Sequence, residues 1–76
     1  MRLVSAADKL DNARAILHDY RAQGEALWRR FRGGKEGTLW YYRVTVEALR
    51  AGGSTPLIEE LDRVVSEIER WAASQG

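Results

Sequence analysis

Asp8 and Asn12 are the side chains whose types and spacing best suit chemistry. They lie four residues apart in a segment with helical spacing, which places them one turn apart on the same helix face. A carboxylate beside a side-chain amide could help to hold a metal ion. The same two positions lie roughly opposite Leu3, Leu10 and Leu17 on a helical wheel, so a solvated helix face is the alternative interpretation.

The other polar candidates do not complete such a site. His18 is the only histidine and there is no cysteine, so the chain has neither a multi-histidine cluster nor thiolates for a metal site or a disulfide. His18 and Asp19 form a His-Asp dipeptide, but a surface histidine is the simpler interpretation. Lys35 lies in the glycine-rich run of residues 33–38, which lacks the spacing of a phosphate-binding loop and a preceding strand. We therefore favour a flexible interhelical loop there.

Aromatic and basic side chains are concentrated in the middle of the chain. The most basic stretch also contains two rings and comprises Trp28, Arg29, Arg30, Phe31, Arg32 and Lys35. The net charge of only +1 favours buried rings with solvated arginines over a nucleic-acid-binding surface. A second group could form core, an aromatic ligand pocket or a helix–helix dimer interface, and consists of Trp40, Tyr41, Tyr42 and Trp71. Three Trp and three Tyr are a large aromatic area for 76 residues, so we expect part of it to be buried against a partner subunit.

Glycines divide the chain into four apolar segments that must position these side chains. The first predicts a long helix over about 6–23, with Ser5 and Asp8 as a capping-box-like start and Gly24 as its stop. The second predicts a short helix over 25–32. The third predicts a helix over about 38–51 capped by Thr38, since its length and 3–4 spacing outweigh the strand propensity of its β-branched and aromatic residues.

The fourth segment has the clearest helical signals. Ser54 or Thr55 caps it, and Pro56 lies in the first turn. Its apolar stripe is unbroken and comprises Leu57, Leu61, Val64, Val65, Ile68, Trp71 and Ala72, while residues 73–76 are expected to fray. The sequence therefore predicts one all-α domain over 1–76. We expect a small bundle of about four helices, two long, one medium and one short, completed by oligomerisation.

Composition excludes several classes of protein. An apolar content of 45% is too high for a disordered chain. There is no apolar run of transmembrane length and no signal-peptide pattern, so we expect a soluble cytoplasmic protein that binds neither membrane nor nucleic acid. Residues 1–38 hold eight Lys/Arg and five Asp/Glu, whereas residues 39–76 hold four and six, which could favour packing of one half on the other.

Several of these motifs together resemble a known family. The run ADKLDN at 7–12 is similar to the last metal-ligand helix of HD-domain metal-dependent phosphohydrolases of the RelA/SpoT-like, alarmone-hydrolase branch, where the pattern is Ala-Asp-x-x-His-Asn. Asp11 stands where that family usually has His. The runs ALWRRF at 26–31, GKEGTLWYYR at 34–43 and PLIEEL at 56–61 look like the tail that follows the catalytic core in that family.

The resemblance implies a C-terminal portion of such an enzyme. It implies that Asp8 is one ligand of a divalent metal, with Mn the expected ion, and that Asn12 lies near a nucleotide substrate. In the family a metal-bound hydroxide attacks phosphorus. This chain lacks the other ligands, so we expect no catalytic residue, no metal bound by the chain alone and no hydrolysis. The alternative is a small non-enzymatic helical module that forms a homo-oligomer through its aromatic helix faces.

Overall fold

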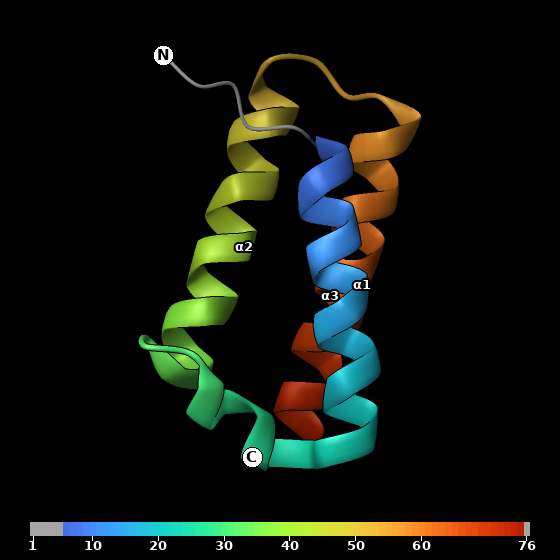
Figure 1. The fold of residues 1–76 in the computed structure, drawn as a ribbon. Coiled ribbons are helices and arrows are strands. Elements are labelled where there is room, and N and C mark those ends of the chain that lie inside the picture. Colours follow the sequence, from blue (N-terminus) through green and yellow to red (C-terminus); the bar gives the residue numbers. More distant parts are fainter. Residues whose placement is uncertain (1–5, 76) are drawn as a thin grey trace.

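The computed structural model describes residues 6–75, and this part of the chain is helical without any strand (Figure 1). Three α-helices and one 3-10 helix follow in order: α1 (Ala6–Gln23), η1 (Gly24–Arg30), α2 (Gly34–Ala51) and α3 (Pro56–Gln75). The all-α prediction is confirmed. The predicted helix count is only partly right, because the second segment forms a 3-10 helix and the three α-helices have similar lengths of 18, 18 and 20 residues.

α3 is the helix against which the other two pack. It contacts both α1 and α2, whereas α1 and α2 make few direct contacts with each other. Figure 1 shows α2 standing away from α1, with η1 connecting the two at one end of the molecule. The three α-helices therefore do not close into a symmetric bundle, and none of the described helices covers one flank of α2.

The core lies between α3 and the facing stripes of the other elements. Leu61 and Val65 of α3 are almost completely buried, as are Ala13 of α1, Leu27 of η1 and Val46 of α2. The predicted stripe of α3 needs one correction. Leu57 is 39% exposed and Ile58 is buried in its place, because the helix begins at Pro56 and turns position 57 outward.

The start of α2 differs from the prediction. The helix begins at Gly34, four residues before the predicted start, and Thr38 is a buried residue within it rather than its N-cap. Gly34 has φ +66°, which glycine tolerates best, and its N–H donates to the Phe31 carbonyl over 3.0 Å. Lys35 is held by Glu25 and by the Ala72 carbonyl, each over 3.1 Å. These tertiary contacts fold the glycine-rich run into the helix.

The other predicted helix ends are largely right. α1 spans the predicted residues and is followed by Gly24 at φ +65°. Thr55 caps α3, since its hydroxyl accepts from the Ile58 N–H over 3.2 Å. The helix continues through Gln75, and the fraying expected for residues 73–75 stays a prediction. The proposed cap at Ser5, the apolar contribution of Leu3 and the end at Gly76 lie outside the described residues.

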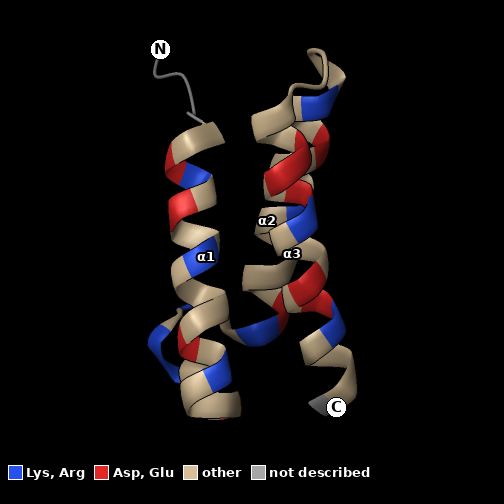
Figure 2. Cartoon of the chain, turned by 90° about the vertical axis from the view of Figure 1, so that its right-hand side faces the viewer, with Lys and Arg blue, Asp and Glu red and all other residues tan. Residues whose placement is uncertain are grey.

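Arginines from both neighbouring helices pair with the acidic residues of α3. Figure 2 shows how acidic and basic positions alternate along this helix. On one side, Arg14 and Arg21 of α1 pair with Glu60 and Glu67. On the other side, two arginines of α2 pair with the same helix, and the contacts are Arg43–Asp62, Arg43–Glu69, Arg50–Asp62 and Arg50–Glu59. These pairs fix how each helix is aligned along α3.

Candidate functional site

Asp8 and Asn12 lie one turn apart in the first half of α1, and both are exposed to solvent. Neither side chain has a hydrogen-bond or ion-pair partner within residues 6–75. In the same part of the chain, no three His, Cys, Asp or Glu side chains come together in a group that could hold a metal ion. Asp8 is therefore a carboxylate on an exposed helix face, and no such group of three forms around it among the described residues.

The His-Asp dipeptide is divided between solvent and an ion pair. His18 is exposed, whereas the Asp19 carboxylate accepts from Arg30 over 2.9 Å and connects α1 to η1. Lys35 donates to Glu25 and to the Ala72 carbonyl, so two of its three N–H donors are used within the fold. Within the described residues, Arg29 and Arg32 are the members of the basic stretch that form no ion pair.

The four aromatic side chains predicted to act together lie in two places. Trp71 packs beside Tyr20, with ring centroids 6.2 Å apart, and it belongs to the border of the core. Tyr42 is buried in the core, whereas Trp40 is 67% exposed and Tyr41 is 43% exposed. The structure thus brings Trp40, Tyr41 and Tyr42 together and leaves Trp71 apart from them.

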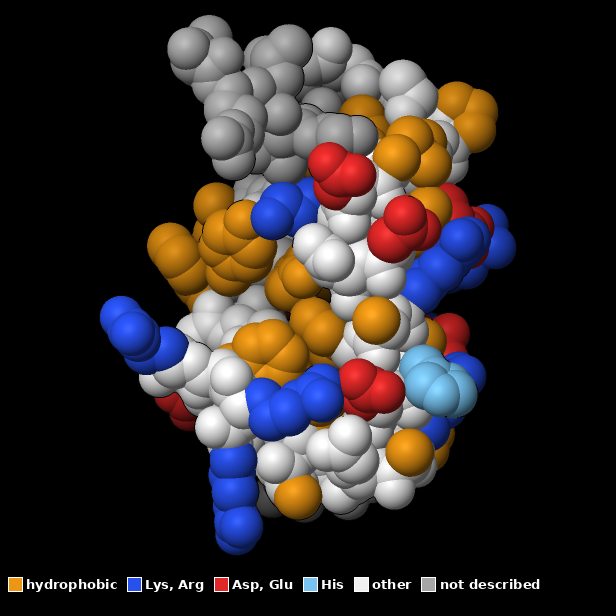
Figure 3. Space-filling model, in the orientation of Figure 1, with side chains coloured by type: hydrophobic (Ala, Val, Ile, Leu, Met, Phe, Trp, Pro, Cys, Tyr) orange, Lys and Arg blue, Asp and Glu red, His pale blue; other side chains and the backbone are white. Residues whose placement is uncertain are grey.

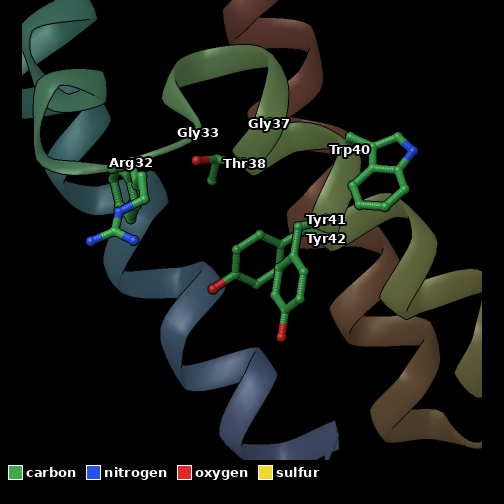
Figure 4. Close-up of a pocket in the computed structure, with 8 residues that line it drawn as sticks. Arg32, Gly33, Gly37, Thr38, Trp40, Tyr41 and Tyr42 are labelled. Carbon is green, nitrogen blue, oxygen red and sulfur yellow. The ribbon is translucent and has the colours of Figure 1, made fainter.

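A pocket of about 460 Å³ lies where the connection after η1 meets the first turns of α2 (Figure 4). Four rings, an arginine, a threonine and two glycines line it: Phe31, Arg32, Gly33, Gly37, Thr38, Trp40, Tyr41 and Tyr42. Sequence reasoning missed this set because Thr38 was interpreted as a cap and Arg32 as a solvated flank. The available signal was the spacing of Thr38 and Tyr42, which places them on one face of a helix.

Tyr41 and Tyr42 differ in their environments. The Lys9 ammonium donates to the Tyr41 hydroxyl over 2.6 Å and lies 4.8 Å from the centroid of the same ring, so it connects α1 to α2 across the open side of the molecule. Burial raises the pKa of Tyr42, and the nearby Lys9 charge opposes this only in part. The Tyr42 hydroxyl is therefore protonated at neutral pH and can act as a hydrogen-bond donor.

α2 also carries an apolar stripe on the side away from its buried residues. We call this the outer face of α2 and define it as Gly37, Trp40, Tyr41, Val44, Ala48 and Ala51. Its positions recur at intervals of three and four residues, which is the spacing of a helix-packing seam. Val44 is 42% exposed in addition to the two exposed rings. Figure 3 shows hydrophobic side chains gathered over α2 on this side of the molecule.

No described helix is long and apolar enough to cross a membrane. Comparisons with family models, with curated proteins and with solved structures gave no match to this chain. The site is therefore interpreted from its own geometry.

Proposed function

We propose that this chain is a non-catalytic helical interaction module, and that it pairs with a second copy of itself through the outer face of α2. The observation that carries the proposal is that α2 has two apolar faces. One contains Thr38, Tyr42 and Val46 and is buried in the molecule. The other is the outer face, which has no charged residue and no covering helix among the described elements.

The outer face is self-complementary in shape. Its large side chains lie near the start of α2 and its small ones, Ala48 and Ala51, lie near the end. An antiparallel pairing about a two-fold axis near position 46 sets Val44 against Ala48 of the second copy and Tyr41 against Ala51 of the second copy. Large residues then meet small ones throughout the contact, and the two helices can approach closely.

The size of the face predicts a weak dimer. Its three large side chains together expose roughly 300 Å², given that aromatic side chains bury about 150–250 Å² each when fully covered. Patches of this size are among the largest on ordinary monomers, and they often serve in binding. Because stable interfaces cover about 800 Å² per partner, we expect a dissociation constant in the micromolar range.

Sedimentation equilibrium tests the pairing. Ala48→Glu places a charge in the contact and should leave the chain monomeric at concentrations where the wild type is a dimer. Ala15→Glu is the matched control, because Ala15 is an exposed helical alanine on α1 and should not affect association. A wild-type chain that is monomeric at about 1 mM would contradict the proposal, since that excludes a micromolar dissociation constant.

Disulfide trapping tests the register, and the chain has no cysteine to interfere. Val44→Cys and Ala48→Cys chains, mixed and oxidised, should form the mixed disulfide in preference to either homodimer. A parallel pairing would instead bring each position against itself and favour the two homodimers. Preference for the homodimers would overturn the antiparallel register.

We also propose, from the resemblance in sequence, that the chain is the C-terminal helical part of an HD-type phosphohydrolase acting on nucleotides. The observation that favours it is the availability of Asp8 and Asn12. Both project from α1 with no partner in the described residues, as a ligand shared with other segments of an enzyme would. A divalent metal such as Mn²⁺ would need further ligands from a segment outside this chain.

Three observations test this second proposal. Calorimetric titration of the chain with Mn²⁺ should show only weak binding, and Asp8→Ala should change it no more than the control Asp11→Ala. Tight binding abolished by Asp8→Ala would contradict the claim that the chain alone lacks a metal site.

The coding region upstream should encode in frame a His and a His-Asp pair. The longer chain should hydrolyse a nucleotide in the presence of Mn²⁺ only while Asp8 is intact. Absence of the His and the His-Asp pair upstream, together with no hydrolysis by the longer chain, would reject the relationship.

A further inference from the structure

The pocket between η1 and α2 contains polar groups that no described residue satisfies. Thr38 and Tyr42 are each only 9% exposed, and neither hydroxyl has a hydrogen-bond partner within residues 6–75. Among the described residues, every fully buried side-chain nitrogen or oxygen has a hydrogen-bond partner. The Thr38 and Tyr42 hydroxyls have none there, so each must be partly accessible to solvent. Both side chains line the pocket, so a group bound there could reach these hydroxyls. Buried hydroxyls of this kind are normally bonded, and an incoming group could satisfy them.

The Arg32 side chain supplies a positive charge at the same pocket. Arg32 lines it and has no ion pair with a described carboxylate, whereas Arg30 is paired with Asp19. Figure 4 shows the Arg32 guanidinium and the tyrosine hydroxyls around the same space. A guanidinium and two hydroxyl donors provide charge-assisted hydrogen bonds for one anionic group.

The rest of the lining is aromatic. Trp40 and Tyr41 present exposed rings at the pocket, and Phe31 borders it from the connection before α2. Rings of this kind could also surround an organic cation. Arg32, together with Lys9 on the Tyr41 ring, disfavours a cation by like-charge repulsion. The volume of about 460 Å³ is in the range of small-molecule sites.

From this geometry we infer that the pocket is a binding site for a flat aromatic carboxylate. The ring of the ligand lies against Phe31 and Tyr41, and its carboxylate accepts from Arg32, Thr38 and Tyr42. The Arg32 guanidinium and the nearby Lys9 ammonium both favour a negatively charged ligand. The site is separate from Asp8 and Asn12, neither of which lines the pocket. It shares Gly37, Trp40 and Tyr41 with the outer face of α2, so pairing through that face would compete with the ligand.

An NMR titration with 2-naphthoate tests the inference. We expect saturable shifts of backbone amides within residues 31–42, with a dissociation constant of about 0.1–1 mM, as a ligand of this size in a half-open pocket should have. The uncharged 2-naphthamide should bind about tenfold more weakly, because it loses the charge-assisted bond. Absence of saturable shifts at about 10 mM would overturn the proposal, since that lies well above the expected range.

Matched variants locate the binding groups. Arg32→Gln should weaken 2-naphthoate binding about tenfold or more and should leave 2-naphthamide binding unchanged. Arg29→Gln is its control, since Arg29 is also exposed and has no ion pair in the described residues but does not line the pocket. Thr38→Val keeps the shape and removes the hydroxyl, so it should weaken binding about threefold to tenfold. Equal affinities for Arg32→Gln and Arg29→Gln would reject the assigned orientation.

Two further variants separate this site from the proposed dimer. Gly37→Leu should block the pocket, because a Cβ at Gly37 meets no atom within 4 Å and a side chain there enters open space at the lining. Gly37 is helical without a positive φ, so this variant should fold. Ala48→Glu should abolish pairing and leave 2-naphthoate binding at least as tight as in the wild type. Loss of binding in Ala48→Glu would show that the site needs the second copy and would overturn the inference that one chain forms it.

Discussion

Arg43 is the residue that most directly holds α2 against α3. Its guanidinium donates to Asp62 over 2.9 Å, to Ser66 over 3.2 Å, and to the two Glu69 oxygens over 3.0 and 2.6 Å. Removing it takes the cation from Glu69 and leaves Asp62 paired with Arg50 alone. We therefore expect Arg43→Ala to lower the free energy of unfolding by about 1–3 kcal/mol in urea denaturation. Arg63→Ala is the control, since that side chain is 73% exposed and pairs only within α3, and it should cost about 0.5 kcal/mol or less.

The same contact predicts how stability depends on pH. The hydrogen bond from Arg43 lowers the pKa of Asp62 below its ordinary value of 3.8, and the hydrogen bond from Tyr20 likewise lowers the pKa of Glu25. A carboxyl whose pKa is lower in the folded state stabilises the protein above its unfolded pKa, and this contribution is lost as the pH falls through the folded pKa. Thermal unfolding between pH 7 and pH 2 should therefore show a falling Tm below about pH 4. Asp62→Asn should reduce the size of that fall, and an unchanged fall would show that Asp62 is not a source of it.

Among the elements, α2 has the least regular start, and its glycines play different roles. Gly34 has φ +66°, whereas Gly37 is an ordinary helical residue whose added Cβ would meet nothing within 4 Å. We expect Gly34→Ala to destabilise the protein by about 1 kcal/mol or more, because alanine is strained at positive φ. Gly37→Ala should instead stabilise it by about 0.5–1 kcal/mol, because it removes glycine from a helix interior. Equal effects in urea denaturation would show that this turn does not constrain the helix start.

The elements also show what the sequence could and could not predict. α1 and α3 were predictable because their apolar stripes are long and their stop and cap residues, Gly24 and Thr55, act locally. The first turn of α2 was not predictable, because Gly34 and Gly37 are typical of a loop. The contacts that order this turn come from Glu25 and from Ala72, which is distant in the sequence. The pocket at Thr38 was missed for the same reason, since its shape depends on how the connection after η1 meets α2. Asp8 and Asn12 were found from spacing, and α1 places them on one exposed face, where the described residues form no group of three His, Cys, Asp or Glu.

For the whole molecule, the uncovered side of α2 links stability to association. A protein that is stable partly through pairing must unfold at a temperature that rises with its concentration, by mass action. We expect the Tm from differential scanning calorimetry to rise by several degrees between about 10 µM and 1 mM chain, which follows from a micromolar dissociation constant. Ala48→Glu should show the same Tm at both concentrations. A wild-type Tm that does not depend on concentration would contradict the dimer.

The central place of α3 also has a consequence for the order of folding. The arginine pairs that join α2 to α3 span as few as 12 residues, whereas those that join α1 to α3 span 46. Closing the shorter loop costs less chain entropy, so α2 and α3 should come together in the transition state before α1 docks. Val46→Ala in α2 should then mainly slow refolding, whereas Ala13→Gly in α1 should mainly accelerate unfolding. In stopped-flow experiments the two substitutions would thus move opposite arms of the chevron plot.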